Sequence, residues 1–230
     1  MAHFVEHTSC DACGSSDGRG LYSDGGWFCF ACRKSSKSNQ YTPVEAVEED
    51  TLALPPGCTQ DFGTEAVDWF KRYDLDVQDM VRHKLLWHEK RKQLVFSYYE
   101  NDKLMCYQAR NFSPTAKAKS YTKGSLKSCY PVYVGTSDTL VLVEDPASAI
   151  KVNKYAGLST MPCLGSGIAK DRLAYLAQKY RKIYVWLDSN MLHSSMNIVA
   201  QLTMLGCESE PIFTMKDPKE CSIVQIQQLL

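Results

Sequence analysis

The sequence lacks several features that would have placed it in a specialised class of protein. Its 230 residues carry 26 basic and 26 acidic side chains, so the overall charge favours neither a polyanionic nor a polycationic partner. No apolar run approaches the roughly 20 residues that cross a membrane, and the opening MAHFVEHTS has no apolar core of a secretory signal. We therefore expect no membrane partner, a cytoplasmic location and reduced cysteines.

A phosphate-binding loop of the form G-x-x-x-x-G-K-[ST] is also absent. The nearest stretch, CLGSGIAK at residues 163–170, is too short and is typical of a turn that enters a helix. These residues therefore do not encode a helicase motor, and any helicase that works with the chain is expected to be a separate protein.

Four of the ten cysteines have the spacing of a metal site. Cys10 and Cys13 form one C-x2-C pair, Cys29 and Cys32 form another, and 15 residues separate the two. Zinc prefers four thiolates in a tetrahedron, and two such pairs supply them. Disulfide pairing of these cysteines is disfavoured in a reducing compartment. We predict a structural zinc site.

The residues between the two cysteine pairs predict a ribbon. YSDGGWFCF, residues 22–30, alternates apolar and polar residues around Asp-Gly-Gly, which indicates two short strands and a turn. We assign the zinc ribbon to residues 1–33. Residues 34–50 are rich in serine and lysine and then in acids, with no helical or strand period, and are predicted to be a flexible linker.

Residues 51–136 are predicted to form a small basic α+β subdomain. Apolar spacing predicts a helix over 64–73, and strands are expected over 93–99 and 103–110 around an Asn-Asp turn. The segment 110–127 contains no acid. Its charges fit either phosphates or a solvated basic loop, and the candidate phosphate-binding residues are Arg110, Lys119, Lys123 and Lys127.

Residues 137–230 alternate between apolar strands and amphipathic helices. This rhythm predicts an α/β subdomain with a Rossmann-like parallel sheet, whose chemistry lies at the carboxyl ends of the strands. The expected strands cover residues 140–143, 158–163, 183–187 and 211–215, and the expected helices cover 147–155, 171–180 and 192–205.

Oxygen ligands follow three of the expected strands. Glu144 and Asp145 end the first, Asp188 and Asn190 follow IYVWL, and Asp217 follows the last. Carboxylates gathered at one rim suit magnesium or manganese. The competing interpretation is helix capping. For Asp145, a role at the site and a role as a cap remain equally open.

In this order, the motifs resemble a known family. A strand ending in Glu, a strand ending in an Asp-x-Asp-like triplet and a later Lys-Asp are similar to the TOPRIM fold of primases and topoisomerases. With the zinc ribbon ahead of it, nearly the whole chain resembles the DNA primase part of bacteriophage primase-helicase proteins. The motifs that carry this resemblance are SDGGWFCFAC, LVFSYYENDKLMCYQARNF, KSYTKGSLK, VLVEDPASAI, VWLDSN and KDPKE.

The resemblance implies a metal-dependent nucleotidyltransferase that makes short RNA primers on single-stranded DNA. Residues 51–230 would then be the RNA polymerase domain, with a TOPRIM subdomain from residue 137. Glu144, Asp188 and Asp217 match the catalytic acids, and these three together with Asn190 match the magnesium ligands. The basic residues of segment 110–127 match those along the template and nucleotide path.

The resemblance also gives the ribbon a role in binding the template. Asp24 falls where the family places a template-reading residue, and Trp27 either stacks on a base or packs within the ribbon. The implied partners are a single-stranded DNA template, ribonucleoside triphosphates, a separate replicative helicase and a DNA polymerase. The implied setting is the cytoplasm of a bacterium infected by a phage.

One departure keeps a second function in view. Asn190 replaces the second acid of the Asp-x-Asp pair, which retains an oxygen ligand and removes a negative charge. A catalytically weakened DNA-binding replication accessory is therefore an alternative. A recombination-mediator clamp also combines four cysteines with a TOPRIM fold, but that family places a helix-hairpin-helix segment before the zinc site. The order here argues against it.

Overall fold

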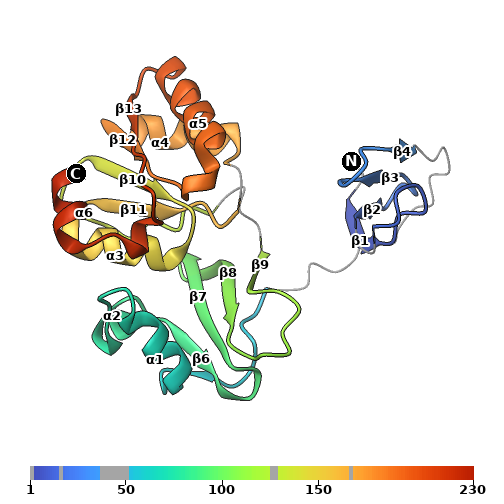
Figure 1. Ribbon diagram of the computed structural model, residues 1–230, viewed down its shortest axis with the longest axis horizontal. Helices are drawn as coiled ribbons and strands as arrows, with labels where there is room; N and C mark the ends of the chain where they lie inside the picture. The colour runs from blue at the N-terminus through green and yellow to red at the C-terminus, as the bar shows by residue number, and fades with distance from the viewer. Residues whose placement is uncertain (1–2, 16–17, 37–51, 125–128, 166–167) are drawn as a thin grey trace. The chain divides into compact units, whose positions relative to one another are not determined.

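The computed structural model describes residues 3–15, 18–36, 52–124, 129–165 and 168–230. The chain divides into two compact units, Met1–Thr51 and Leu52–Leu230 (Figure 1). The first contains the four-cysteine pattern. The second contains the predicted basic α+β subdomain and the predicted parallel sheet. The combination of a zinc ribbon, an α+β subdomain and a parallel α/β sheet confirms the predicted fold class.

The first unit is an antiparallel meander of four short strands. Asp24 and Gly26 shape the tight turn between β2 and β3, because the Asp24 carboxylate accepts a hydrogen bond of 2.9 Å from the Gly26 N–H. Gly25 takes the left-handed φ of 75° that this turn requires. The strands are β1 (Phe4–Thr8), β2 (Arg19–Tyr22), β3 (Trp27–Cys29) and β4 (Ser35–Ser36).

β4 corrects one predicted boundary. We expected the linker to begin at residue 34, yet Ser35–Ser36 pairs with Trp27 and Phe28 of β3. The pairing uses only backbone groups and both serines are exposed, so the side chains carry no apolar alternation from which the strand could be predicted. The rest of the predicted linker, residues 37–50, lies outside the described residues.

The second unit begins with a five-stranded antiparallel sheet. Asn101 and Asp102 both have positive φ in the β7–β8 turn, which is the conformation that a two-residue hairpin favours. The strands follow one another in the order β5 (Cys58–Thr59), β6 (Leu86–His88), β7 (Gln93–Glu100), β8 (Lys103–Asn111) and β9 (Ser120–Gly124), with α1 (Thr64–Lys71), α2 (Val77–Arg82) and the short helix η1 (Glu89–Arg91) inserted between β5 and β7.

The second sheet is parallel and has the order β11-β10-β12-β13. The chain leaves β10 for β11 on one side and then crosses to β12 on the other side. The topological switch point of the sheet therefore lies between β10 and β12, where ligands bind in open parallel sheets. The strands are β10 (Thr139–Val143), β11 (Ser159–Pro162), β12 (Lys182–Val185) and β13 (Glu208–Pro211).

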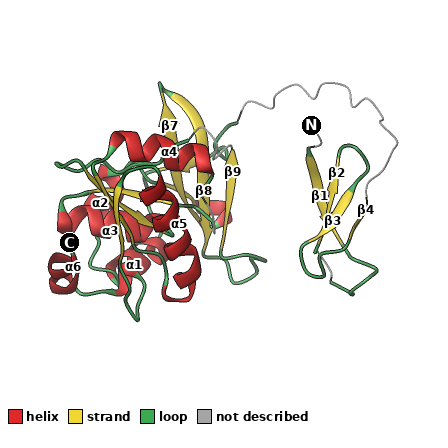
Figure 2. Cartoon of the chain, turned by 90° about the horizontal axis from the view of Figure 1, so that it is seen from above, coloured by secondary structure: helices red, strands yellow, loops and turns green. Residues whose placement is uncertain are grey.

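Helices cover both faces of the parallel sheet (Figures 1 and 2). One apolar core joins the sheet to α3 and α6, and another joins it to α4 and α5. Within the described residues, no helix combines the length and the apolar character needed to cross a bilayer. The helices are α3 (Pro146–Ala156), α4 (Lys170–Lys179), α5 (Leu192–Met204) and α6 (Ile223–Leu229), with short helices η2 (Ser189–Met191) and η3 (Pro218–Glu220).

The last strand lies earlier than predicted. We expected it over 211–215, but β13 covers Glu208–Pro211 and pairs with β12. β13 is an edge strand with alternating exposed and half-buried side chains, so its sequence is polar. Phe213 and Met215, which favoured the later strand, are exposed in the following loop. The position of this strand in the sequence is therefore determined by its pairing with β12 and not by apolar residues.

Buried charges connect the antiparallel part of the second unit to the parallel part. Lys151 of α3 is 1% exposed. Its ammonium donates hydrogen bonds to the Asp74 carboxylate at 2.9 Å and to the Lys219 carbonyl at 3.0 Å. Lys154 of the same helix reaches the buried Asp79 carboxylate at 2.7 Å. These ion pairs fix α3 against the segment that carries α1 and α2.

Candidate functional site

The four predicted zinc ligands come together in the ribbon. The four sulfur atoms lie within 4.8 Å of one another. Cys10 and Cys32 Sγ are 3.9 Å apart, and Cys13 and Cys29 Sγ are 3.7 Å apart. Sulfurs about 2.3 Å from a tetrahedral zinc ion are about 3.8 Å from one another, whereas a disulfide requires about 2.05 Å. The cluster therefore fits zinc.

A backbone N–H favours the thiolate form of Cys29 in this cluster, whereas, despite a backbone hydrogen bond from Ser15, the pKa of Cys13 is raised to about 12 by burial and by hydrogen bonds from the neighbouring thiols. The Cys32 N–H donates to Cys29 Sγ at 3.5 Å. This hydrogen bond, against the opposing effect of burial, lowers the pKa of the Cys29 thiol to about 6. A thiol that ionises near neutral pH is suited to bind a metal ion. Among the described residues, no other group of three Cys, His, Asp or Glu side chains gathers its ligand atoms in this way.

The two predicted template-reading residues lie in the same ribbon. The Asp24 carboxylate is engaged by the Gly26 N–H in the β2–β3 turn. Trp27 is half-buried in β3, and the Arg19 guanidinium lies 5.5 Å from its ring centroid. The ring therefore has an intramolecular partner and retains an exposed part. A role in reading the template stays a prediction for both residues.

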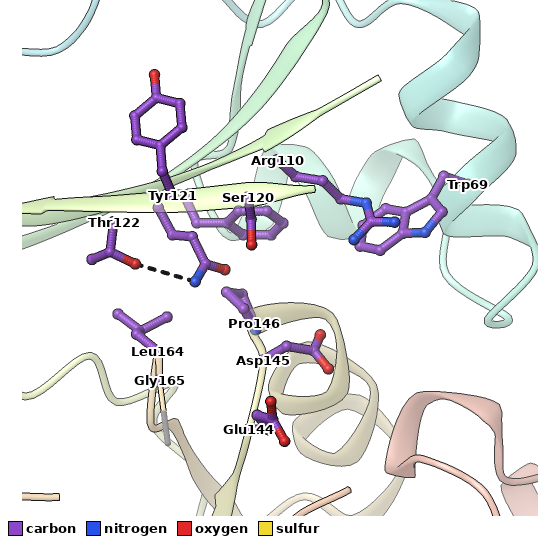
Figure 3. Close-up of a pocket in the computed structure, with 12 residues that line it drawn as sticks. Trp69, Arg110, Ser120, Tyr121, Thr122, Glu144, Asp145, Pro146, Leu164 and Gly165 are labelled. Carbon is purple, nitrogen blue, oxygen red and sulfur yellow. Dashed lines mark hydrogen bonds between the residues drawn. The ribbon is translucent and has the colours of Figure 1, made fainter. Parts of the chain in front are cut away.

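The second unit contains a cavity of about 420 Å³. β8 and β9 line one side, and the residues that follow β10 line the other. Figure 3 shows Arg110 beside the Trp69 ring on the first side, and Glu144 and Asp145 on the second. The cavity thus brings one cation and two carboxylates together from segments far apart in the sequence.

Arg110 is the predicted basic residue that the structure places in this cavity. Its guanidinium carbon lies 4.1 Å from the Trp69 ring centroid and 5.7 Å from that of Phe112. Burial lowers its pKa from the usual value, and its Nε is buried with no hydrogen-bond partner. Apolar spacing predicted only that Trp69 lies in a helix, because its contact with Arg110 depends on the position of β8.

Neither Lys119 nor Lys123 is among the residues that line the cavity. Lys119 is exposed just before β9. Lys123 is opposite Tyr107 in the register of β8 and β9, whereas the cavity residue Thr122 is opposite Gln108. Side chains alternate along a strand, so Lys123 is on the face of the sheet away from the cavity. Lys127 lies outside the described residues.

Polar side chains that the sequence analysis did not select also line the cavity. Ser120 and Thr122 of β9 line it, as does Gln108 of β8. The Gln108 amide donates to the Thr122 hydroxyl at 3.3 Å (Figure 3). The period-two alternation from Arg110 back to Gln108 was the available signal. Ser120 and Thr122 could not be placed from the sequence, because their position depends on how β9 pairs with β8.

Two predicted acids flank the switch point of the parallel sheet. Glu144 follows β10 and Asp188 follows β12. Glu144 Oε2 and Asp188 Oδ1 are buried, and neither has a hydrogen-bond partner in the described structure. Burial raises the pKa of Asp188 to about 7 even though Lys219 opposes this shift, and burial together with nearby acids raises the pKa of Glu144. Buried carboxylate oxygens without a hydrogen-bond partner are suited to coordinate a hard cation such as magnesium.

Asp145 and Asp217 share a lysine that the sequence analysis did not select. Lys219 Nζ donates to Asp145 Oδ2 at 2.9 Å and to Asp217 Oδ2 at 2.8 Å. Asp145 also caps α3, accepting from the Ala147 and Ser148 N–H groups. Asp145 therefore caps α3 and also lines the cavity, so both of its possible roles stay open. Asn190 is exposed in η2.

Solved structures with the same architecture include bacterial and phage primases. The primase fragment of the bacteriophage T7 primase-helicase has a TM-score of 0.52 and 18% identity, covering 98% of this chain and 97% of that one. The Aquifex aeolicus primase, with its zinc-binding and RNA polymerase domains, has a TM-score of 0.61 and 12% identity, covering 100% and 79%. The E. coli primase catalytic core has 0.56 and 10%, covering 68% of each.

No protein-family model matches the sequence. The structural likeness nevertheless defines the class of fold, a four-cysteine ribbon followed by a unit with the fold of primase catalytic domains and their TOPRIM-type parallel sheet. More particularly, the chain has the fold of the primase fragment of a phage primase-helicase over nearly its whole length. The resemblance seen in the sequence is thus confirmed at the level of the fold.

Proposed function

We propose that this protein is a DNA primase that makes short RNA primers on single-stranded DNA by metal-dependent nucleotidyl transfer. The observation that carries the proposal is the cavity in which Arg110 is opposite Glu144 and Asp145, with the unpartnered Asp188 at the neighbouring strand end. A cation for phosphates and free carboxylates for a metal ion are the two requirements of phosphoryl transfer.

The reaction would join two ribonucleotides. The 3′-hydroxyl oxygen forms a bond to the α-phosphorus of a triphosphate, the bond from that phosphorus to the bridging oxygen breaks, and pyrophosphate leaves. A bound magnesium or manganese ion would supply positive charge for the phosphates and the attacking oxygen. Glu144 and Asp188 would hold this ion, with Asp217 beside them as predicted.

Protein side chains would contribute binding and proton uptake. Arg110, already desolvated against Trp69, would bind the triphosphate, since a guanidinium pairs with two phosphate oxygens at once. The proton of the 3′-hydroxyl would pass to the Glu144 carboxylate oxygen that does not hold the ion. Lys119, Lys123 and Lys127 remain candidates for contacts along the template outside the cavity.

The ribbon would bind the template, with Asp24 and Trp27 as its proposed reading residues. Related structures support nucleic acid as the partner: a DnaG primase catalytic domain has been solved with single-stranded DNA. T7 primase domains have been solved with an RNA/DNA hybrid and the T7 lagging-strand DNA polymerase. By analogy, we propose a DNA polymerase and a separate helicase as partners in a phage-infected bacterium.

Primer synthesis tests this function directly. The full chain is incubated with single-stranded DNA, radiolabelled ribonucleotides and either magnesium or manganese. Short RNA products are expected from the wild type, and Glu144→Gln or Asp188→Asn is expected to reduce them by about 100-fold or more. Glu220→Gln, an exposed acid in the same loop as Lys219, is the matched control and should retain full activity.

The outcomes separate the two candidate functions. Primers that depend on Glu144 and Asp188 support the enzyme. DNA binding without any RNA product, under either metal, would overturn it in favour of a replication accessory that binds DNA without catalysis.

A further inference from the structure

Lys219 lies within the acidic cluster that is proposed to bind metal. Its side chain is 13% exposed and pairs with two carboxylates, Asp145 Oδ2 at 2.9 Å and Asp217 Oδ2 at 2.8 Å. These acids come from different parts of the chain, one at the start of α3 and one before η3. The rim is the edge of the parallel sheet that carries Glu144, Asp145, Asp188 and Asp217. The Lys219 ammonium already bridges two of these four acids.

Further hydrogen bonds hold both the backbone of Lys219 and one of the acids that its ammonium contacts. The Lys219 carbonyl accepts a hydrogen bond of 3.0 Å from the buried Lys151. On the acceptor side, the Ala147 and Ser148 N–H groups and the Ser148 hydroxyl bind the Asp145 carboxylate. The Lys219 backbone and the Asp145 carboxylate are therefore each held by further contacts, unlike the partners in a flexible surface ion pair.

The cluster is thereby divided into two pairs of acids. Asp145 and Asp217 each give one oxygen to Lys219. Glu144 and Asp188 instead have buried oxygens with no hydrogen-bond partner in the described structure. This second pair is the one that an added cation would satisfy. Among the described residues, no three carboxylates gather their oxygens as closely as the four cysteines gather their sulfurs.

From this division, and resting on the proposed function, we propose that Lys219 is a positioning residue that limits the rim to one divalent cation. Glu144 and Asp188 are the ligands of that cation, and the ammonium supplies the second positive charge. Two-metal sites hold their ions about 3.5–4 Å apart. A fixed ammonium on Asp145 and Asp217 occupies the place of a second ion and repels it.

Manganese binding to the full, zinc-loaded chain tests this proposal without reference to activity. Free Mn²⁺ is counted by electron paramagnetic resonance for the wild type, Lys219→Met, Lys219→Arg and Lys216→Met. Methionine keeps the length of the side chain and removes the charge, whereas arginine keeps the charge. Lys216 is an exposed lysine of the same loop, so Lys216→Met is the matched control for net charge.

One bound ion is expected for the wild type, Lys219→Arg and Lys216→Met. Lys219→Met is expected to bind a second ion, or to bind the first about tenfold or more tightly, because an opposing charge has been removed. Its melting temperature should also rise more on addition of Mn²⁺. This second measurement reports on the site even if the variant is less stable without the ion.

Unchanged or weaker Mn²⁺ binding by Lys219→Met would overturn the proposal, as would two ions on the wild type. These outcomes are distinguishable from failure of the proposed function. A wild type that makes primers and binds two ions refutes only the role of Lys219. A wild type that makes no primers, while Lys219→Met gains Mn²⁺ affinity, refutes only the enzyme.

Discussion

The guanidinium carbon of Arg110 lies 4.1 Å from the centroid of the Trp69 ring, and this contact places a desolvated cation in the cavity opposite Glu144. Trp69 is 7% exposed. The ring thus both fills the core and holds the charge, because the face of an indole attracts a guanidinium without neutralising it. The full positive charge of Arg110 remains available to a triphosphate.

Replacing the guanidinium should therefore weaken nucleotide binding. Arg110→Lys keeps the charge but loses the planar stack, and we expect the KM for ribonucleotides to rise about 2- to 30-fold, from a contact of about 0.5–2 kcal/mol. Steady-state primer synthesis measures this change. Arg91→Lys, at an exposed arginine, is the control, and an unchanged KM for Arg110→Lys would contradict the assignment.

Loss of one ribbon cysteine should remove zinc and leave the catalytic unit folded. Cys29→Ser is expected to lose the single equivalent of zinc, because three thiolates bind the ion far less tightly than four. Cys58→Ser, at a cysteine outside the cluster, should keep it. Zinc is measured by atomic absorption, together with primer synthesis on templates of different sequence.

The expected signature of Cys29→Ser is residual synthesis with little preference among templates, because the cluster lies in a separate compact unit from the cavity. Retention of the wild-type template preference in the zinc-free variant would refute a reading role for the ribbon.

Restoring an acid at position 190 should strengthen metal binding. Asn190→Asp adds a negative charge two residues after Asp188, and we expect the magnesium concentration for half-maximal activity to fall by up to about tenfold. The measurement is a magnesium titration of primer synthesis. Asn197→Asp, in the exposed part of α5, controls for net charge. A higher magnesium requirement would show that the site is adapted to the amide.

One histidine should make the second unit sensitive to acid. His83 packs edge-on against Tyr133 with ring centroids 4.9 Å apart. Burial lowers its pKa below the usual 6.5, Asp79 opposes this shift, and Arg82 adds to it. The unfolded chain therefore binds the proton first, and the free energy of unfolding should fall as the pH drops below about 6.5.

Urea unfolding at several pH values checks this expectation. His83→Gln should flatten the loss of stability between the unfolded-state pKa and the lower folded-state pKa, whereas His193→Gln, at an exposed histidine, should not. An identical pH dependence in His83→Gln and the wild type would show that the ring titrates normally.

The sequence predicted those parts of the fold that depend on local pattern. The zinc ligands follow from cysteine spacing, and β10 and β12 follow from short apolar runs bounded by polar residues. β13 could not be predicted in the same way, because its polar residues are held by register with β12. Which face of the sheet Lys123 occupies depends in the same way on the pairing of β9 with β8.

The residues of the candidate site also divide into those that a local pattern predicts and those that depend on distant contacts. Glu144 and Asp188 were predictable because each directly follows a strand run at the switch point. Lys219 was not, although it lies in a motif that had been selected, since its role depends on Asp145, which is 74 residues earlier in the chain. Trp69 lies within the predicted helix 64–73 and belongs to the apolar core. Its second role depends on a contact with β8.

The buried ammonium of Lys151 has a consequence for how substrates enter. Separating the two subdomains would break the ion pair between this ammonium and Asp74 and the ion pair between Lys154 and the buried Asp79. The Lys151 ammonium also donates to the Lys219 carbonyl, so movement of the segment that carries Asp217 and Lys219 is opposed by this hydrogen bond. We therefore expect the opening between Arg110 and the acids to change little in width when a nucleotide and a template bind.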